Sequence, residues 1–134
     1  MKKKGYVLDS FALLAYLQAE SNGLKVKEVL REALFAKTAV YMSVISLGEV
    51  LYITERKLGK ETATAILHDI LRLPIHFAET TMDRVVSAAH IKARYAMSYA
   101  DTFVVALAAE LKATIITGDP EFKQVEAMVD ISWL

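Results

Sequence analysis

Four acidic residues in this sequence stand at the borders of apolar segments. Asp9 follows Tyr-Val-Leu, and Asp119 follows Ile-Ile-Thr-Gly. Glu49 precedes Val-Leu-Tyr, and Asp101 precedes Thr-Phe-Val-Val-Ala. A carboxylate beside a buried core is costly unless it is paired, hydrogen-bonded or bound to a metal ion. Four such groups that converge in one crevice would form a cation site, so their arrangement in space decides which chemistry is available.

Two hydroxyl side chains accompany these acids in the sequence. Ser10 directly follows Asp9, and Thr117 comes two residues before Asp119. Hydroxyl groups near metal-binding carboxylates commonly orient them through hydrogen bonds. We therefore expect Ser10 and Thr117 to support the site without binding an ion themselves.

The side chains available to bind a cation here are oxygen donors. The chain has no cysteine, which excludes a zinc finger and favours a reducing cytoplasm. Its histidines, His68, His76 and His90, lack a spacing typical of metal sites such as His-Glu-x-x-His. An all-carboxylate site suits hard cations, so Mg²⁺ or Mn²⁺ is the expected cofactor.

Each acid also has an ordinary structural explanation. Asp9 could cap a helix that begins at the next residue. Glu49 stands three residues after Ser46, the spacing of a capping box. Asp101 suits the positive end of a helix dipole, and Asp119 before proline is common in turns. The sequence leaves these alternatives open for each residue taken singly.

Short apolar segments alternate with helical patterns along the chain. We expect strands at residues 6–8, 40–43, 75–77, 113–117 and 131–133. We expect helices at 10–20, 24–37, 46–58, 60–71, 82–95 and 100–111, with Asn22-Gly23 ending the first of them. Parallel strands need helical crossovers, so this alternation predicts an α/β fold with a mainly parallel sheet of four or five strands flanked by helices.

That fold would bring the acids to one edge of the sheet. Asp9 and Asp119 come just after the first and fourth expected strands, and Glu49 and Asp101 fall in the first turns of expected helices. Ligand crevices in open parallel sheets lie at the carboxyl ends of the strands. The sequence therefore predicts that three or four of these carboxylates meet there.

Length and composition set further limits. A chain of 134 residues is expected to form one domain over residues 1–134. Sixteen Lys plus Arg balance sixteen Asp plus Glu, so net charge neither indicates nor forbids nucleic-acid binding. The hydrophobic content of 54% leaves apolar surface for a subunit or partner interface.

No segment has the character of a membrane span. The basic start followed by an apolar run superficially resembles a secretion signal, but Asp9 interrupts it. The apolar stretch Phe103–Ala109 is far too short to cross a bilayer. We expect a soluble, cytoplasmic protein that does not bind a membrane.

Taken together, the acidic segments resemble PIN-domain ribonucleases, specifically the VapC-type toxins of prokaryotic toxin–antitoxin pairs. The matching segments are Val7–Leu17, Ser43–Tyr52, Ser98–Ala108 and Ala113–Phe122. Their order, spacing and apolar context agree over nearly the whole chain. The sequence departs from the family at Phe11, where many members have a small polar residue, and this affects a secondary hydrogen bond rather than the acidic quartet.

The resemblance implies a PIN-like three-layer fold and hydrolysis of RNA phosphodiester bonds with Mg²⁺ or Mn²⁺. It assigns Asp9, Asp101 and Asp119 as metal ligands, and Glu49 as a ligand of a second ion or as the residue that orients the attacking water. It also implies a homodimer and a cognate antitoxin that enters the acidic crevice. Alternatives are a processing nuclease without an antitoxin and a non-catalytic RNA- or protein-binding module of the same fold.

Two other classes with similar strand–acid patterns are disfavoured. A haloacid-dehalogenase-like phosphatase needs a second Asp two positions after the first, and Phe11 stands there. A response-regulator receiver needs a late Lys that is absent directly after Ile115-Ile-Thr.

Candidate RNA contacts come from the helix expected before Asp101. Arg84, Lys92 and Arg94 lie in this region and could touch phosphates. A solvated helix face is the alternative, because scattered Lys and Arg are ordinary surface residues.

Overall fold

Five parallel strands form the central sheet in the computed structural model, which describes residues 3–134. The strands are β1 (Lys4–Leu8), β2 (Thr38–Ser43), β3 (His76–Ala78), β4 (Thr114–Thr117) and β5 (Ile131–Trp133). Their order across the sheet is β3-β2-β1-β4-β5, and every neighbouring pair is parallel. The predicted α/β fold with a parallel sheet is confirmed.

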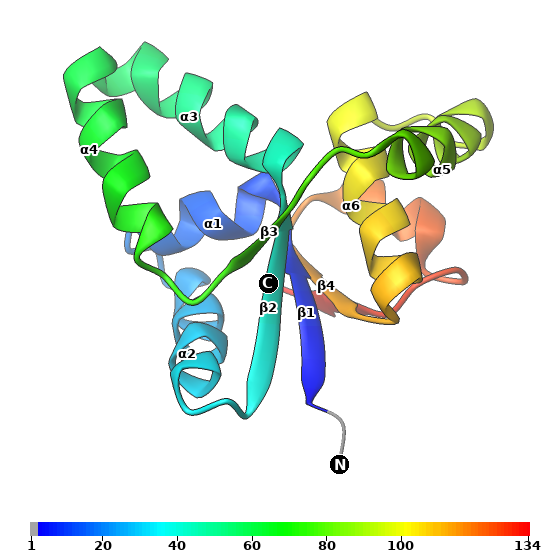
Figure 1. Cartoon of the computed structure of the whole chain (residues 1–134), viewed down its shortest axis with the longest axis horizontal. Coiled ribbons are helices and arrows are strands. Elements are labelled where there is room, and N and C mark those ends of the chain that lie inside the picture. Colours follow the sequence, from blue (N-terminus) through cyan, green and yellow to red (C-terminus); the bar gives the residue numbers. More distant parts are fainter. Residues whose placement is uncertain (1–2) are drawn as a thin grey trace.

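Helices cover both faces of this sheet. They are α1 (Ser10–Leu17), α2 (Gly23–Leu34), α3 (Val44–Leu58), α4 (Lys60–Leu71), α5 (Met82–Arg94) and α6 (Tyr99–Leu111), with the 3-10 helix η1 (Pro120–Val125) after β4. Figure 1 shows α1 to α4 on one side of the strands and α5 and α6 on the other, which gives three layers. Within residues 3–134, no helix has both the length and the apolar character that crossing a bilayer requires.

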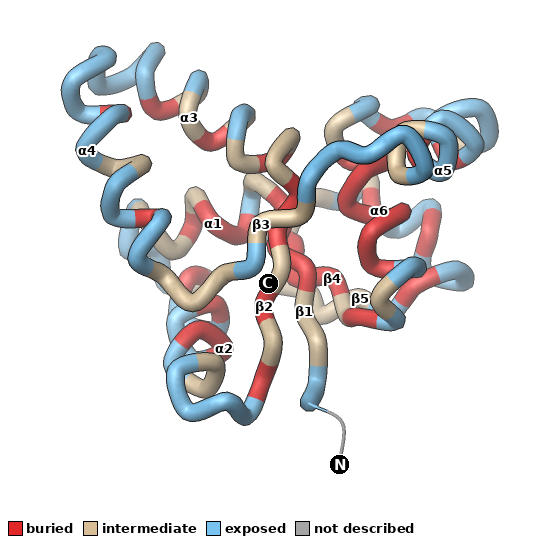
Figure 2. The backbone as a smooth tube through the Cα atoms, in the orientation of Figure 1, coloured by how far each residue is buried: buried red, intermediate tan, exposed pale blue. Residues whose placement is uncertain are grey.

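The core follows from strands that are buried on both faces. Val7 and Ile115 contribute to a cluster with α6, whereas Leu8 and Ile116 contribute to a cluster with α1 and α2. Successive side chains of a strand point to opposite faces, so each strand needs consecutive apolar residues to serve both layers. Figure 2 shows the resulting burial along the strands and α6.

Strand order reverses beside β1, at the carboxyl ends of β1 and β4. The chain leaves β1 through α1 and α2 to reach β2 on one side, whereas β4 joins β1 on the other side. Such a reversal of strand order is the usual ligand-binding position in parallel sheets. The pairing of Leu8 with Ile116 then brings Asp9 opposite Thr117.

Several expected helix limits differ from the structure, and α2 ends at Leu34 rather than at residue 37. The first helix ends at Leu17 rather than near residue 20. Ala19, two residues after this end, has a left-handed φ of 52°. Gly23 was expected to help end that helix, but it is the first residue of α2. A Cβ on Gly23 would lie 2.4 Å from the carbonyl oxygen of Ala15, so glycine is needed there for the close approach of α2 to α1.

The capping-box interpretation of Ser46 and Glu49 is wrong. Helix α3 begins two residues earlier than expected, at Val44, and Ser43 caps it by accepting a hydrogen bond from the N–H of Ile45 at 3.1 Å. Ser46 lies inside the helix, where its buried hydroxyl has no hydrogen-bond partner among residues 3–134. Glu49 is therefore free of the local role that the spacing suggested.

Candidate active site

Asp9 lies at the carboxyl end of β1 and is almost completely buried, with 1% of its surface exposed. One carboxylate oxygen accepts a hydrogen bond from the N–H of Ala12 at 2.8 Å. Asp9 therefore caps α1, as its position before this helix predicted. The other oxygen accepts a hydrogen bond from the hydroxyl of Thr117. Each oxygen keeps further acceptor capacity, so the cap does not prevent Asp9 from binding an ion.

Thr117, the last residue of β4, connects the ends of β1 and β4. Its fully buried hydroxyl donates to Asp9 and accepts the N–H of Asp119 at 3.0 Å. A single hydroxyl therefore fixes the position of one carboxylate and the backbone of another acid. These contacts are the ones expected of a residue that orients a metal-binding site.

Asp119 occupies the loop between β4 and η1. One of its carboxylate oxygens accepts the N–H of Glu121 at 2.9 Å, and Pro120 begins the 3-10 helix. Proline suits the first helical position because it lacks an N–H that would otherwise be unpaired. The turn interpretation of Asp119 is thus confirmed, and its second carboxylate oxygen has no part in that cap.

Asp101 stands in the first turn of α6, with 7% of its surface exposed. Ser98 caps this helix by accepting the N–H of Asp101 at 3.2 Å. The apolar residues that follow pack α6 against β1 and β4 and hold the start of the helix beside the crevice. The helix N-terminus favours a negative charge at this position, whereas burial opposes it.

Glu49 reaches the same region from α3. Burial raises the pKa of Glu49. The hydroxyl of Ser10 opposes this by stabilising the ionised Glu49 carboxylate. Its Oε1 atom is buried without a hydrogen-bond partner among the described residues. A buried acceptor without a donor is unfavourable, and a cation or its bound water would relieve it.

The pKa values of the acids report how close their charges lie. Burial raises the pKa of Asp9 and of Asp101 from 3.8 to about 7 in each case. Hydrogen bonds oppose this shift, and repulsion from neighbouring carboxylates adds to it, from Asp119 and Glu49 in both cases. The structure thus places Asp9 and Asp101 close enough to Asp119 and Glu49 for those two charges to raise the pKa values of both.

Glu121 is an acid of this region that sequence reasoning missed. Carboxylate oxygens of Asp101, Asp119 and Glu121 all lie within 4.8 Å of one another, a spacing that can hold a metal ion. This group differs from the predicted set of metal ligands, which had Asp9 where this one has Glu121. The sequence signal was the Asp119-Pro-Glu121 spacing, which brings two acids to the start of one short helix.

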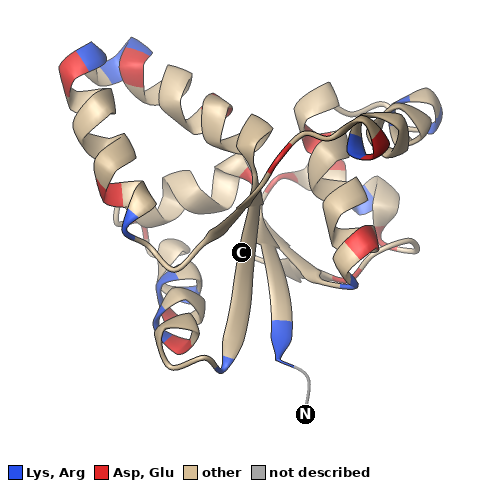
Figure 3. Ribbon diagram, viewed as in Figure 1, with Lys and Arg blue, Asp and Glu red and all other residues tan. Residues whose placement is uncertain are grey.

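The donor set fits a divalent cation. All the acids present oxygen, and neither salt bridge found within residues 3–134, Arg72–Asp69 or Arg84–Glu110, involves the site. Figure 3 shows acidic segments at the carboxyl ends of the strands, while basic segments lie at the opposite ends of β1 and β2 and on the outer helices. Hard cations with oxygen ligands are the groups that such an uncompensated acidic site favours.

The three basic residues predicted to touch RNA lie on α5. Two of them form hydrogen bonds within the chain. Arg84 pairs with Glu110 of α6 at 2.9 Å and donates to the carbonyl of Glu79 at 2.8 Å. Lys92 donates to the carbonyl of Met97 at 2.7 Å. Arg94 is exposed. These contacts connect α5 to its neighbours.

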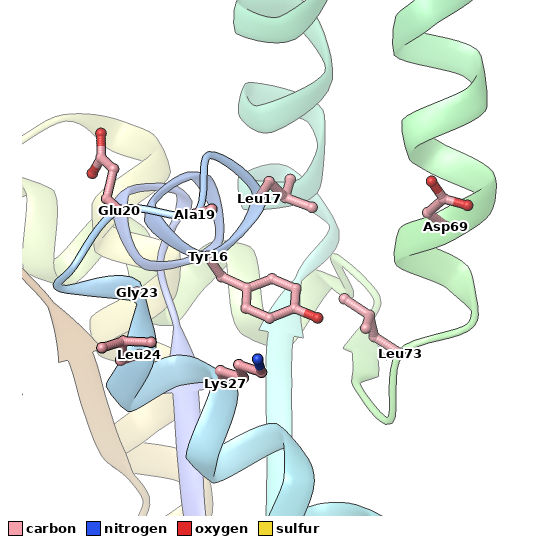
Figure 4. Close-up of a pocket in the computed structure, with 9 residues that line it drawn as sticks. All are labelled: Tyr16, Leu17, Ala19, Glu20, Gly23, Leu24, Lys27, Asp69 and Leu73. Atoms are coloured by element: carbon pink, nitrogen blue, oxygen red, sulfur yellow. The ribbon is translucent and has the colours of Figure 1, made fainter.

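A separate hollow of about 420 Å³ lies at the other end of α1 from Asp9. Figure 4 shows Tyr16 and Lys27 on one side of it and Asp69 and Leu73 on the other. None of the predicted site residues lines this hollow. It is therefore distinct from the acidic crevice.

Comparison with known families identifies a matching domain. The family model of the PIN domain matches residues 6–128. No curated protein sequence matches the chain. The domain match covers all four predicted acids and Glu121.

Solved structures with a similar fold include toxin–antitoxin proteins. VapBC2 of Rickettsia felis, bound to a promoter DNA fragment, has a TM-score of 0.76 and 16% identity over 97% of this chain and 98% of that chain. DNA-bound VapBC of Salmonella typhimurium has a TM-score of 0.74 and 17% identity over 98% of each chain. VapC20 of Mycobacterium tuberculosis, described as a sarcin-ricin loop cleaving toxin, has a TM-score of 0.67 and 19% identity over 90% and 94% of the two chains. At these identities the likeness establishes a shared fold.

Proposed function

This chain belongs to the PIN-domain family, and on that premise we propose that it is a metal-dependent endoribonuclease and the toxin of a VapBC-type toxin–antitoxin pair. The observation that carries the proposal is the gathering of carboxylates at the carboxyl ends of β1 and β4. Oxygens of Asp101 and Asp119 lie within 4.8 Å of each other, and the charges of Asp119 and Glu49 add to the raised pKa values of Asp9 and Asp101. Uncompensated carboxylates gathered in one crevice are unfavourable unless a cation or protons neutralise them. A site of this kind is suited to phosphodiester hydrolysis with Mg²⁺ or Mn²⁺.

In this proposal Asp9, Asp101 and Asp119 bind the ion, and Glu49 binds a second ion or orients the attacking water. A bound divalent ion lowers the pKa of its water and neutralises charge on the phosphate. Hydrogen bonds from Ala12 and Thr117 hold the Asp9 carboxylate in one orientation. The unpartnered Oε1 of Glu49 is available to accept a hydrogen bond from the attacking water.

Solved structures of similar fold support two parts of the proposal: RNA as the substrate and a toxin as the role of this chain. Two of them are VapBC assemblies, and one is a toxin described as cleaving the sarcin-ricin loop. We extend these properties to this chain as part of the proposal. A cognate antitoxin that covers the acidic crevice would then block access to the ion and the RNA.

A homodimer in the cytoplasm completes the proposal. Several large apolar side chains are exposed, including Tyr52 and Leu58 on α3, Leu71 on α4 and Met82 on α5. Apolar side chains left exposed in this way are available for association with another protein surface. Size-exclusion chromatography with light scattering gives the oligomeric state directly, and a monomer at all concentrations would contradict this part of the proposal.

Cleavage of RNA by the purified chain tests the central claim. We expect cutting of single-stranded RNA in Mg²⁺ or Mn²⁺, loss of cutting in EDTA, and loss of cutting in Asp101→Asn. Asp69→Asn is the matched control, because Asp69 is an exposed acid on α4 outside the site. Circular dichroism should show that both variants fold. Full activity of Asp101→Asn, or equal activity in EDTA, would contradict the mechanism.

The toxin role needs its own test. Co-expression with the product of a small neighbouring reading frame should suppress RNA cleavage and yield a complex that co-purifies. A metal-dependent nuclease without such a partner would fit the processing-nuclease alternative. Binding of RNA without cleavage would fit the non-catalytic alternative.

A further inference from the structure

Phe11 lies in the first turn of α1, two residues after Asp9, with 38% of its surface exposed. Its ring belongs to none of the three buried apolar clusters found within residues 3–134. The hydroxyl of Ser10, directly before it, lies near enough to Glu49 of the acidic site to oppose the rise that burial causes in the pKa of that carboxyl group. The ring therefore stands at the edge of the site and does not form part of the core.

The ring rests directly on the backbone of Gly118. A Cβ added to Gly118 would lie 2.4 Å from Cε1 of Phe11 and 2.7 Å from Cζ. Gly118 does not have a left-handed φ, so backbone conformation does not require glycine there. The Phe11 ring occupies the space that a side chain at position 118 would take, so any other residue there would displace the ring from this place.

This contact fixes an aromatic ring beside the acids. Gly118 connects Thr117, which hydrogen-bonds Asp9, to Asp119, which lies within 4.8 Å of Asp101 through its carboxylate oxygen. A ring seated on Gly118 is thus adjacent to the loop that presents one of the proposed metal ligands. Hydrogen bonds hold the residues on either side of Gly118, and part of the ring remains exposed.

We propose that Phe11 is a specificity-determining residue that stacks on the unpaired base next to the phosphate to be cut. This inference rests on the proposed function. An aromatic ring offers a nucleobase a flat apolar surface and tolerates every base, because every base has a π-face. A base can reach such a ring only when it is unstacked, as in single-stranded RNA and loops. Phe11 would thereby position the backbone over the acids and favour unpaired RNA.

The test couples a protein change to an RNA change. The probe is a single-stranded RNA of mixed sequence whose cut site is first mapped with the unmodified protein. Phe11→Ala should lower kcat/KM on this RNA by about 5- to 150-fold, the range expected for loss of one base–aromatic stack, mainly through KM. Phe11→Tyr should restore kcat/KM to within about twofold, since it keeps the ring.

Abasic RNA separates stacking from a structural effect of the mutation. Removing the base on one side of the cut should lower kcat/KM of the unmodified protein but have little effect on Phe11→Ala, because the stack is already lost. Phe35→Ala is the matched control, since Phe35 is an exposed aromatic residue at the end of α2. It should cut like the unmodified protein.

The outcomes separate failure of the stacking role of Phe11 from failure of the proposed nuclease activity. If the unmodified protein cuts RNA and Phe11→Ala cuts with the same kcat/KM, the stacking role is refuted while the nuclease stands. The same holds if abasic substitution on either side weakens both proteins equally, or if Phe11→Ala loses only binding to a protein partner. If the unmodified protein does not cut RNA with Mg²⁺ or Mn²⁺, the proposed function fails and the stacking role fails with it.

Discussion

The hydroxyl of Thr117 donates a hydrogen bond to the carboxylate of Asp9, joining residues that are 108 positions apart in the sequence. Parallel pairing of β1 with β4 makes them neighbours, and the same hydroxyl receives the N–H of Asp119. Thr117 and Asp9 are both buried, so each depends on the other to satisfy part of its hydrogen-bonding capacity. This contact therefore connects the stability of the sheet to the geometry of the acidic site.

Replacing Thr117 by valine tests this connection. Thr117→Val keeps the shape of the side chain but leaves an oxygen of Asp9 and the N–H of Asp119 without their partner. We expect a loss of about 1–3 kcal/mol in the free energy of unfolding, together with weaker metal binding. Urea denaturation measures the first effect. Thr64→Val, at an exposed helix position, should change stability by less than about 0.5 kcal/mol. Equal effects of the two substitutions would refute the assigned role.

Stability without metal should depend on pH in an unusual direction. The pKa values of Asp9 and Asp101 in the folded protein are about 7, above the ordinary 3.8. Between about pH 4 and pH 7 the folded state therefore binds more protons than the unfolded state, and stability falls as pH rises. We expect urea unfolding in EDTA to give a lower free energy at pH 8 than at pH 5.

Asp101→Asn provides the control for this pH effect. The amide cannot ionise, so the variant should lose less stability than the unmodified protein between pH 5 and pH 8. At pH 8 it should be more stable than the unmodified protein in EDTA, by on the order of 1–3 kcal/mol. A protein that gains stability steadily across this window would contradict the raised pKa values.

Metal should stabilise the protein more strongly at higher pH. A ligand that binds only the folded state raises Tm by mass action, and the carboxylates must lose their protons to bind an ion. With pKa values of about 7 for Asp9 and Asp101, protons compete with Mg²⁺ or Mn²⁺ at pH 6 more than at pH 8. Thermal unfolding with millimolar metal should therefore show a larger increase in Tm at pH 8. The absence of any shift at either pH would count against a metal site.

Glu121→Gln distinguishes between two possible ligand sets. The oxygen of Glu121 lies within 4.8 Å of those of Asp101 and Asp119, whereas the sequence predicted Asp9 as the third ligand. If Glu121 binds the ion or its water, the substitution should weaken metal affinity by about 10- to 100-fold. Isothermal titration with Mn²⁺ measures this. Glu126→Gln, at the exposed end of η1, is the matched control. Unchanged affinity in Glu121→Gln would favour the set with Asp9.

Gly118→Ala should clash with the ring of Phe11. The added Cβ would lie 2.4 Å from Cε1, so the ring must rotate out of its present position, at a cost of about 0.5–1.5 kcal/mol. In a Phe11→Ala background the same change should cost much less, because the space is then open. A double-mutant cycle by urea denaturation measures this coupling. Additive effects of the two substitutions would show that the ring does not occupy this space.

The order of strands and helices was predictable from the sequence because it depends on local patterns. Apolar runs bounded by turns indicated strands, and helical spacing of apolar residues indicated helices. The ends were less predictable. Ala19 takes a left-handed φ that ends α1 early, and the Ser43 cap starts α3 before Ser46. Backbone hydrogen bonds close the end of α1, and the Ser43 hydroxyl caps the start of α3; apolar periodicity reports neither.

Local sequence patterns were enough to predict that carboxylates follow strands or open helices, because Asp9, Asp101 and Asp119 each stand at the border of an apolar segment. The metal-binding and catalytic roles assigned to them stay predictions. Three contacts could be seen only in the folded chain: Thr117 with Asp9, Glu121 with the acidic group, and Phe11 with Gly118. Each of them joins residues on different elements. Their distances depend on strand order, register and helix packing, which are properties of the whole chain.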